Sequence, residues 1–417
     1  MALLFSRNPV YDANKKLFGY DLSYQIETEG LSPSAEEPDK TGSDSDVMVA
    51  GFMGMDFRQL ASSRRVFLTF SERMLIHEAA TLFPKENVII QIKKDIELSP
   101  EILQACRSVR KSGYLLAVDE AFVKNQADEL VEMADFIKVD FRRIQAEDNN
   151  HDQLDFNRLL NSRRRWVAVH IDTHEAFDLA RQYPFSLFQG HFVSRPVIIS
   201  QKEVPSSHMS HLRLINAIES EAPSFEEISR IIESDPHLSF EILRITNSVF
   251  YYRGQKIRSI RQAAIMMGLN ELRKWAMVTT LRRFNQQDDS GLVNHCAHRA
   301  RTLEKLSQKM GLGAKMHEFF TLGLLSMIDT LTQSSMELVL TELAISDDMK
   351  NILLGKEDQG EMAECFSLIL AYEMGNWSKT KQISQKLDIG SETIKDAYYD
   401  SIIWANGFDS GQTDSSD

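Results

Sequence analysis

A chain of 417 residues, of which 43% are hydrophobic, is long enough to bury two separate cores. It carries 60 acidic against 47 basic residues, a net charge of −13, and the acidic excess is shared by both halves of the chain. This balance argues against the clustered Lys and Arg residues of a large nucleic-acid interface, so we expect no nucleic-acid partner.

Cysteine usage and hydropathy both predict a cytoplasmic protein. The three cysteines are far apart and form no CxxC pair, which indicates neither a disulfide framework nor a zinc site. The apolar run from Ala2 to Phe5 is too short for a signal peptide, and no later window approaches the roughly 20 apolar residues of a membrane span. We therefore expect no membrane insertion.

The first 200 residues alternate short apolar runs with longer amphipathic ones, which is typical of β/α units with buried strands. The runs expected to form strands are Ala2 to Val10, Leu17 to Ile26, Val66 to Phe70, Val88 to Ile92, Leu115 to Val118, Phe136 to Val139, Trp166 to Ile171 and Leu187 to Phe188. Eight strands, mostly separated by helical stretches, predict a barrel. Residues 31–46, rich in Ser, Pro, Glu and Asp, are interpreted as a surface loop.

The pattern changes near Ser200. From Pro205 to about Trp404 the apolar residues recur at three- and four-residue spacing, which predicts an all-helical domain. We therefore place one domain over residues 1–200 and a helical domain over 201–406. Residues 407–417, mostly Gly, Ser, Thr and Asp, are interpreted as a disordered tail.

Two helix starts in the second half carry specific capping signals. Ser224 and Glu227 form a capping box that opens a helix from Phe225 to Glu233. Asp235 followed by Pro236 predicts an N-cap and a first-turn proline for the next helix, which runs to about Thr246.

Three segments of the first half resemble an EAL domain, the modified (β/α)8, TIM-like barrel that hydrolyses cyclic di-GMP with two divalent metals. They are "NPVYDANKKLFGYDLSYQ", "ADFIKVDF" from Ala134 to Phe141, and "LFQGHFVSRP" from Leu187 to Pro196, in the order and spacing of that family. The resemblance implies a site of carboxylates at the C-terminal ends of the barrel strands, because two Mg²⁺ or Mn²⁺ ions need hard oxygen ligands.

The same resemblance implies that most metal ligands are replaced. The signature Glu becomes Asp21, an Asn ligand becomes Thr69, a Glu ligand becomes Gln91 and a later Glu becomes Val169. The glycine loop that follows the paired aspartates of the family is absent. What remains are the remnants Asp21, Asp119, Glu120, Lys138, Asp140 and Gln189. We expect no catalytic residue, no bound metal and no cofactor here.

Binding of cyclic di-GMP without hydrolysis stays open at this point. Gln25 replaces the Arg that usually contacts phosphate, Lys93 and Lys94 replace the usual acidic spacing, and Asp172 takes the place of the family's last motif Glu. No nucleotide-binding residue is assigned. A cyclic-di-GMP receptor and a weak phosphodiesterase are the two alternatives to an inactive barrel.

Residues 205 to about 405 resemble an HDOD domain, a relative of the HD phosphohydrolases that has lost their metal ligands. The matching segments are "IIESDPHLSFEILRITNSVFY", "IRSIRQAAIMMGLNELRKW" and "FFTLGLLSMID". At the His-Asp position of an HD hydrolase this chain has Leu325 and Ser326. The resemblance therefore implies a regulatory module that binds proteins.

The histidine pairs of this half are interpreted as structural residues. The pairs His208/His211 and His295/His298 have i, i+3 spacing but lack a third ligand, so we interpret them as solvated or core histidines.

Two further positions are interpreted as helix ends, and the methionines as core. Asn247 and Gly268 are typical of residues that end a helix. The methionines at 266, 267 and 277 are interpreted as core.

These inferences combine into one prediction: a YuxH-like EAL–HDOD protein with a degenerate barrel. It would act as a catalytically inactive signalling adaptor in bacterial motility or biofilm-type behaviour. Its expected partners are bacterial signalling, motility or pilus proteins bound by the HDOD domain. Pairing of barrels into a homodimer stays open.

Overall fold

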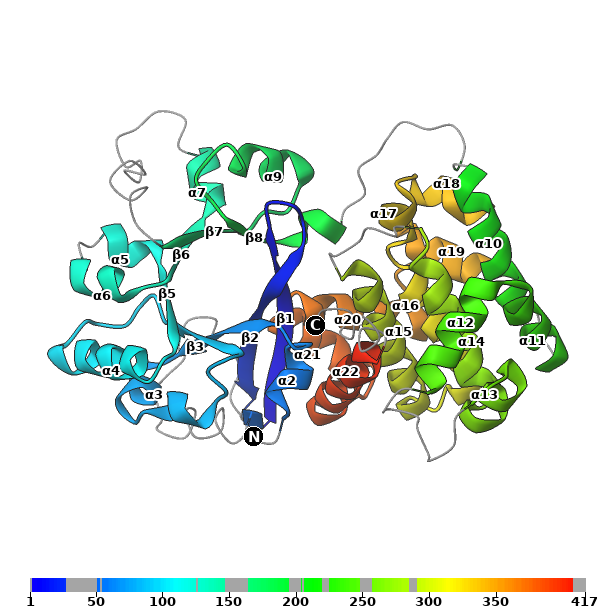
Figure 1. Cartoon of the computed structure of the whole chain (residues 1–417), viewed down its shortest axis with the longest axis horizontal. Helices are drawn as coiled ribbons and strands as arrows, with labels where there is room; N and C mark the ends of the chain where they lie inside the picture. The colour runs from blue at the N-terminus through cyan, green and yellow to red at the C-terminus, as the bar shows by residue number, and fades with distance from the viewer. Residues whose placement is uncertain are drawn as a thin grey trace. The chain divides into compact units, whose positions relative to one another are not determined.

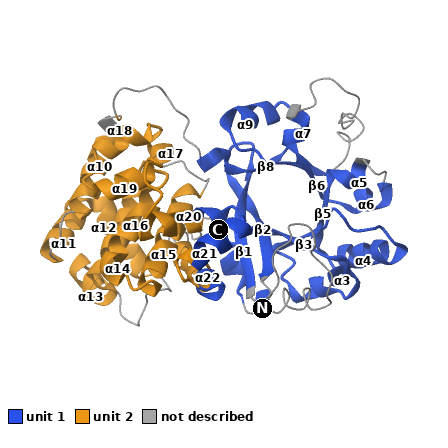
Figure 2. Cartoon of the chain, turned by 180° about the vertical axis from the view of Figure 1, so that it is seen from behind, with its two compact units in different colours: residues 1–195, 370–385, 390–395 blue, residues 196–369, 386–389, 396–417 orange. Residues whose placement is uncertain are grey.

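The computed structural model describes residues 2–27, 51–52, 55–124, 127–146, 164–194, 204, 206–219, 225–247, 257–284 and 291–407. The predicted loop 31–46, the expected boundary at residue 200 and residues 408–417 of the predicted tail lie outside these ranges. The chain divides into two compact units, which are coloured separately in Figure 2. The first, the barrel unit, comprises residues 1–195, 370–385 and 390–395, and the second, the helical unit, comprises residues 196–369, 386–389 and 396–417.

The barrel unit contains a closed barrel of eight strands in sequence order (Figure 1). The strands are β1 (Ala2–Asp12), β2 (Leu17–Glu27), β3 (Arg65–Phe70), β4 (Val88–Ile92), β5 (Leu115–Asp119), β6 (Phe136–Asp140), β7 (Arg165–Val169) and β8 (Leu187–Gln189). β1 is antiparallel to β2 and to β8, and the other neighbours are parallel. The predicted barrel and its strands are confirmed.

One layer of apolar side chains fills the barrel below its strand ends. Its buried members are Val10, Phe67, Ile89, Ala117, Phe136, Val167 and Leu187. Each comes from a different strand, as expected for a small barrel whose interior is packed with side chains. The layer forms because successive side chains of a strand point alternately into and out of the barrel.

Helices surround the strands of this unit. They are α2 (Phe57–Leu60), α3 (Glu72–Ile76), η1 (Ala79–Leu82), α4 (Pro100–Lys111), α5 (Glu120–Lys124), α6 (Asp128–Met133), α7 (Phe141–Ala146), α9 (His174–Ala180) and η2 (His191–Ser194). Residues 370–385 and 390–395, expected in the helical domain, group with the barrel unit.

The described elements of the helical unit are all helices, as predicted. Those that begin before residue 300 are α10 (Ser206–Glu219), α11 (Phe225–Ser234), α12 (Pro236–Thr246), α13 (Ile260–Met267), α14 (Leu269–Leu281) and α15 (Leu292–Lys309). Those that follow are η3 (Gly313–Lys315), α16 (Met316–Leu325), α17 (Ile328–Thr332), α18 (Met336–Thr341) and α19 (Asp347–Leu353). The remaining helices, α20 (Glu361–Glu373), α21 (Trp377–Lys386) and α22 (Ser391–Asn406), have residues assigned to both units.

The predicted capping signals are found where the described residues cover them. Asp235 accepts hydrogen bonds from the backbone N–H groups of His237 and Leu238, and α12 ends at Thr246. Gly268, with φ of 85°, separates α13 from α14. Ser224, the first residue of the predicted capping box, lies outside the described residues, although α11 begins at Phe225 as expected.

The expectations about membrane spans and cysteines can be compared with the structure. Within the described ranges, no helix combines the length and the apolar character needed to cross a membrane. All three cysteines are free and buried.

Candidate functional site

A ring of strand-end residues lies directly above the apolar layer of the barrel. Inward-facing residues recur at every second strand position, so the residue two places after each core residue points into the same interior. These residues are Thr69, Gln91, Asp119, Lys138, Val169 and Gln189. They lie toward the C-terminal ends of parallel strands, the end at which TIM-like barrels build their sites.

Lys138 is the centre of a hydrogen-bonded cluster in this ring. Its Nζ lies 2.9 Å from Oδ2 of Asp21 and donates to Oε1 of Gln91 at 2.6 Å. Nε2 of Gln189 donates to the same oxygen of Asp21 at 2.9 Å. The Lys138 side chain is only 5% exposed and that of Asp21 16%. Three predicted remnants therefore meet, and Gln91 joins them. We call these four residues the Lys138 cluster.

The other predicted remnants on β5 and α5 make separate contacts. Oδ1 of Asp119 accepts the backbone N–H of Ala121, at the first turn of α5. The carboxylate of Glu120 is buried and accepts a hydrogen bond from Arg143 at 3.1 Å. The paired acidic residues thus cap a helix start and bind an arginine.

Asp140, at the end of β6, is paired with Arg142. Their side chains form two hydrogen bonds, at 3.0 and 2.7 Å. Burial, the largest single influence, raises the pKa of Asp140, but the hydrogen bonds from Arg142 and the charges of His170 and Arg142 outweigh it and lower that pKa overall. The Arg142 guanidinium thus holds Asp140 as a carboxylate.

Two histidines at this end of the barrel were not predicted. His170 follows β7 with a left-handed φ of 62°, rare for a residue other than glycine, and its Nε2 lies 3.9 Å from Asp140. Nδ1 of His191 lies 3.1 Å from Asp172, and this hydrogen bond lowers the pKa of Asp172 to about 2. Burial lowers the pKa of His170. Their position directly after β7 and β8 was the signal available in the sequence.

The histidine pairs of the helical unit lie among protein groups. His298 is buried, and its Nε2 lies 3.1 Å from the carbonyl oxygen of Tyr398. His208 and His211 each present their ring edge-on to Phe284, with ring centroids 5.3 Å apart. Among the residues that the structure describes, no group of three or more His, Cys, Asp or Glu side chains is placed to hold a metal.

The segment that replaces the His-Asp motif of HD hydrolases is also packed with protein groups. Leu325 is fully buried, and Oγ of Ser326 accepts a hydrogen bond from Nη1 of Arg299 at 2.7 Å. Nη2 of the same guanidinium lies 3.0 Å from Nε2 of His295. A buried arginine thus occupies the neighbourhood of Ser326 and His295.

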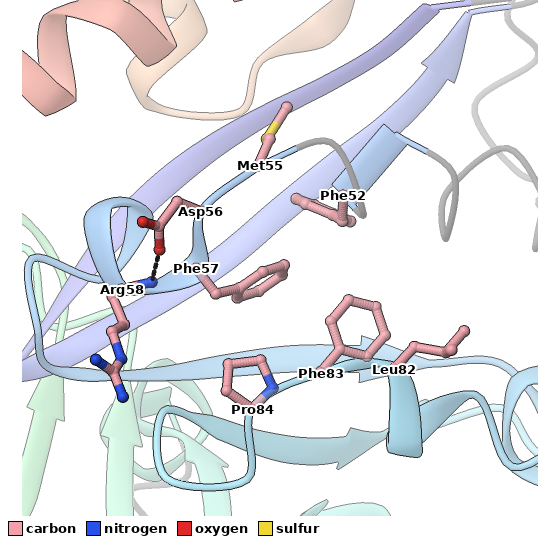
Figure 3. A pocket seen from close by; sticks show the side chains of 8 residues that line it. All are labelled: Phe52, Met55, Asp56, Phe57, Arg58, Leu82, Phe83 and Pro84. Atoms are coloured by element: carbon pink, nitrogen blue, oxygen red, sulfur yellow. Dashed lines mark hydrogen bonds between the residues drawn. The ribbon is translucent and has the colours of Figure 1, made fainter.

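A separate cavity of about 310 Å³ lies on the barrel unit, and Figure 3 shows its lining. The lining residues are Phe52, Met55, Asp56, Phe57, Arg58, Leu82, Phe83 and Pro84. Its carboxylate, on Asp56, accepts the Arg58 backbone N–H and caps α2. None of the strand-end residues lines it, so this apolar cavity is distinct from the Lys138 cluster.

The comparisons with known proteins bear on both halves of the chain. Residues 204–343 match the HDOD domain family, and the closed eight-stranded barrel precedes them.

Two relatives are similar to the chain over nearly its whole length. It is 28% identical over 416 residues to the uncharacterized protein YuxH of Bacillus subtilis (strain 168), covering 97% of this chain and 98% of YuxH. It is 23% identical over 400 residues to the cyclic di-GMP phosphodiesterase CdgJ of Vibrio cholerae serotype O1, covering 96% of this chain and 91% of CdgJ. Among solved structures, the PaMucR phosphodiesterase in complex with c-di-GMP is similar with a TM-score of 0.37 and 14% identity, over 46% of this chain and 91% of that one.

Proposed function

We propose that this chain is an EAL–HDOD protein that acts as a catalytically inactive signalling adaptor. It would regulate bacterial motility or biofilm-type behaviour through protein partners bound by the HDOD domain. The observation that carries the proposal is that the Asp21 carboxylate is already bound by the ammonium of Lys138 and the amide of Gln189.

Charge at the barrel mouth supports the absence of catalysis. Two divalent cations need several anionic oxygens that are free to bind them. Here the carboxylates have protein partners, namely Lys138 for Asp21, Arg143 for Glu120, Arg142 for Asp140 and His191 for Asp172. Thr69, Gln91 and Val169 add no charge. A metal binding to one of these four carboxylates would have to displace an ammonium, a guanidinium or an imidazole from it.

The ammonium group of Lys138 is bound by other side chains of the protein. A lysine that helps to cleave a phosphodiester must direct its ammonium at water or at phosphate. Nζ of Lys138 instead lies within hydrogen-bonding distance of Asp21 and Gln91, and it stands 4.6 Å from the ring centroid of Phe67. These contacts favour a structural role.

The test is a phosphodiesterase assay on the purified full-length protein with Mn²⁺ or Mg²⁺ and cyclic di-GMP, with CdgJ assayed in parallel. We expect no linear product over time, and the same baseline for Lys138→Ala and Asp119→Ala. Linear, metal-dependent product release that Lys138→Ala abolishes would instead establish an active phosphodiesterase.

A cyclic-di-GMP ligand is the second candidate, because the name of CdgJ, a relative over 96% of this chain, assigns that substrate to CdgJ. Isothermal titration calorimetry with and without Mg²⁺ separates this receptor from the adaptor. No heat at high micromolar nucleotide would exclude the receptor, whereas saturable heat without turnover would favour it.

The proposed adaptor role requires that the protein bind a specific protein partner. Affinity capture with the full-length protein from a bacterial lysate should recover a signalling, motility or pilus component. Surface substitutions in the helical unit should remove that component, whereas substitutions in the Lys138 cluster should not. Recovery of no specific protein would count against the adaptor.

A further inference from the structure

Strand β1 has one long edge that β8 leaves unpaired. β1 pairs with β2 from Ala2 to Tyr11, but its pairing with β8 is restricted to Val10–Asp12. The segment from Leu3 to Asn8 therefore extends as part of a two-stranded ribbon beyond the contact with β8. Such an edge presents backbone N–H and C=O groups to any other strand that approaches it, and proteins usually cover it.

A segment from the far end of the chain covers this edge. The backbone N–H of Phe5 donates to the hydroxyl oxygen of Tyr372 at 3.4 Å, and both side chains are fully buried. Tyr372 belongs to residues 370–385, which we call the strap and which group with the barrel unit. Figure 2 shows the strap in the colour of the barrel, beside β1 and β2.

The shape of the strap is specified locally. At the end of α20, Gly375 has a φ of 65°, which favours glycine. The N–H of Asn376 bonds the carbonyl of Ala371 and the N–H of Gly375 bonds that of Tyr372, the two bonds of a Schellman motif. Oδ1 of Asn376 then accepts the N–H of Lys379 and caps the start of α21.

The strap meets the ribbon where the ribbon carries small side chains. Ser6 and Ser23 are directly opposite each other in the register of β1 and β2. A Cβ atom at Gly375 would lie 3.4 Å from Cβ of Ser23 and 3.5 Å from Oγ of Ser6. The Ser6 hydroxyl is buried and has no hydrogen-bond partner among the described residues. A small side chain at this position therefore leaves room for the strap.

We infer that the strap is an intramolecular cap that prevents this edge of β1 from pairing with the same edge of a second copy of this chain. The sequence of this edge is apolar from Ala2 to Phe5, and from Ala2 to Ser6 it contains no charged side chain and no proline. Such a segment pairs readily with itself once its edge is exposed. This role is independent of the proposed adaptor function.

Hydrogen–deuterium exchange of the full-length protein tests the contact directly. Tyr372→Phe removes only the hydroxyl acceptor, so the amide of Phe5 should exchange about threefold faster, the effect of losing one modest hydrogen bond. Tyr114→Phe is the matched control, because its buried hydroxyl donates to the Phe83 carbonyl elsewhere in the barrel unit. Unchanged exchange at Phe5 in Tyr372→Phe, or equal acceleration in both variants, would overturn the cap.

The self-association step has its own test. Ser6→Leu places a bulky side chain under the strap, whereas Ser6→Ala keeps the space. Light scattering over a range of concentrations should show a larger mass for Ser6→Leu than for the wild type, with Ser6→Ala unchanged. A folded Ser6→Leu protein that keeps the wild-type mass at every concentration would refute the guarding role.

Discussion

Lys138 and Asp21 form an ion pair inside the barrel, with Nζ and Oδ2 2.9 Å apart across β6 and β2. The two strands are not neighbours in the sheet, so the pair joins opposite sides of the barrel interior. Charges with such low exposure need their partner, because an isolated ion loses hydration without compensation.

Replacing Lys138 with Met should therefore destabilise the protein. It leaves the Asp21 carboxylate without its cation, and we expect a loss of about 3 kcal/mol in the free energy of unfolding. Urea unfolding followed by circular dichroism measures this. Lys93→Met is the control, because its ammonium lies 3.8 Å from the exposed Asp95 and should contribute under about 1 kcal/mol.

Adding Asp21→Asn to Lys138→Met should recover about 1 kcal/mol or more, because the uncompensated charge is then gone. Purely additive losses in the double variant would contradict the pairing.

Gly190, which follows β8, packs against the backbone of Ile171, which follows β7. It has a φ of 152°, and a Cβ atom there would lie 2.0 Å from the backbone oxygen of Ile171. Gly190→Ala must therefore move backbone next to Gln189, and we expect a loss of at least about 2 kcal/mol in the free energy of unfolding. Gly313→Ala, with no atom within 4 Å of its added Cβ, should change stability by less than about 0.5 kcal/mol. Equal effects would contradict the crowding at Gly190.

The strands of the barrel could be predicted because each one is a short apolar run, mostly separated from the next by an amphipathic helical stretch. A second regularity, the two-residue period of side chains along a strand, determines which residues share the ring above the apolar layer, so Gln91 and Lys138 could be placed at the same level. The pairing of Asp21 with Lys138 and Gln189 could not be predicted, because it depends on the barrel closure that brings residue 189 back to residue 21. His170 and His191 were missed because the family resemblance assigns no role to either residue.

The strap could not be predicted from periodicity. Residues 370–385 have the helical spacing of the second half, and nothing local distinguishes them from the helices before them. Their grouping with the barrel unit rests on contacts such as that between Phe5 and Tyr372, which are 367 residues apart. A domain boundary placed where the hydrophobic pattern of the sequence changes therefore misses a later segment that groups with the first domain.

Asp235 should make the free energy of unfolding depend on pH in the acidic range. Hydrogen bonds from Arg283 hold its pKa well below the usual value, against the opposing effect of burial. A carboxylate with a lowered pKa in the folded state adds stability above its unfolded pKa of about 4, and that stability is lost as pH falls below this value.

Asp235→Asn keeps an acceptor for the cap of α12 but loses the charge opposite Arg283. We expect a loss of about 1 kcal/mol in the free energy of unfolding at pH 7, measured by urea unfolding. The difference from the wild type should shrink as pH falls from about 4 toward 2. A difference that stays constant over that range would show that the ion pair is not responsible.

Asn247 connects the end of α12 to the backbone of Ile257. Its Nδ2 donates to the carbonyls of Leu243 and Ile257 at 2.7 and 2.8 Å, and its Oδ1 accepts the N–H of Ile257 at 2.8 Å. The predicted helix-ending role is thus confirmed, and the bonds to Ile257 extend it. Asn247→Ala removes all three bonds and should cost about 2 kcal/mol in the free energy of unfolding.

Asn247→Asp separates the contribution of the Asn247 hydrogen bonds to stability from the contribution of the space that its side chain fills. It keeps the shape and the acceptor for Ile257, but it loses both donors and places a carboxylate oxygen against two carbonyls. We therefore expect a loss at least as large as that of the Ala variant at pH 7, because the repulsion adds to the missing bonds. Urea unfolding of both variants measures this, and an Asp variant as stable as the wild type would show that the Nδ2 bonds contribute nothing.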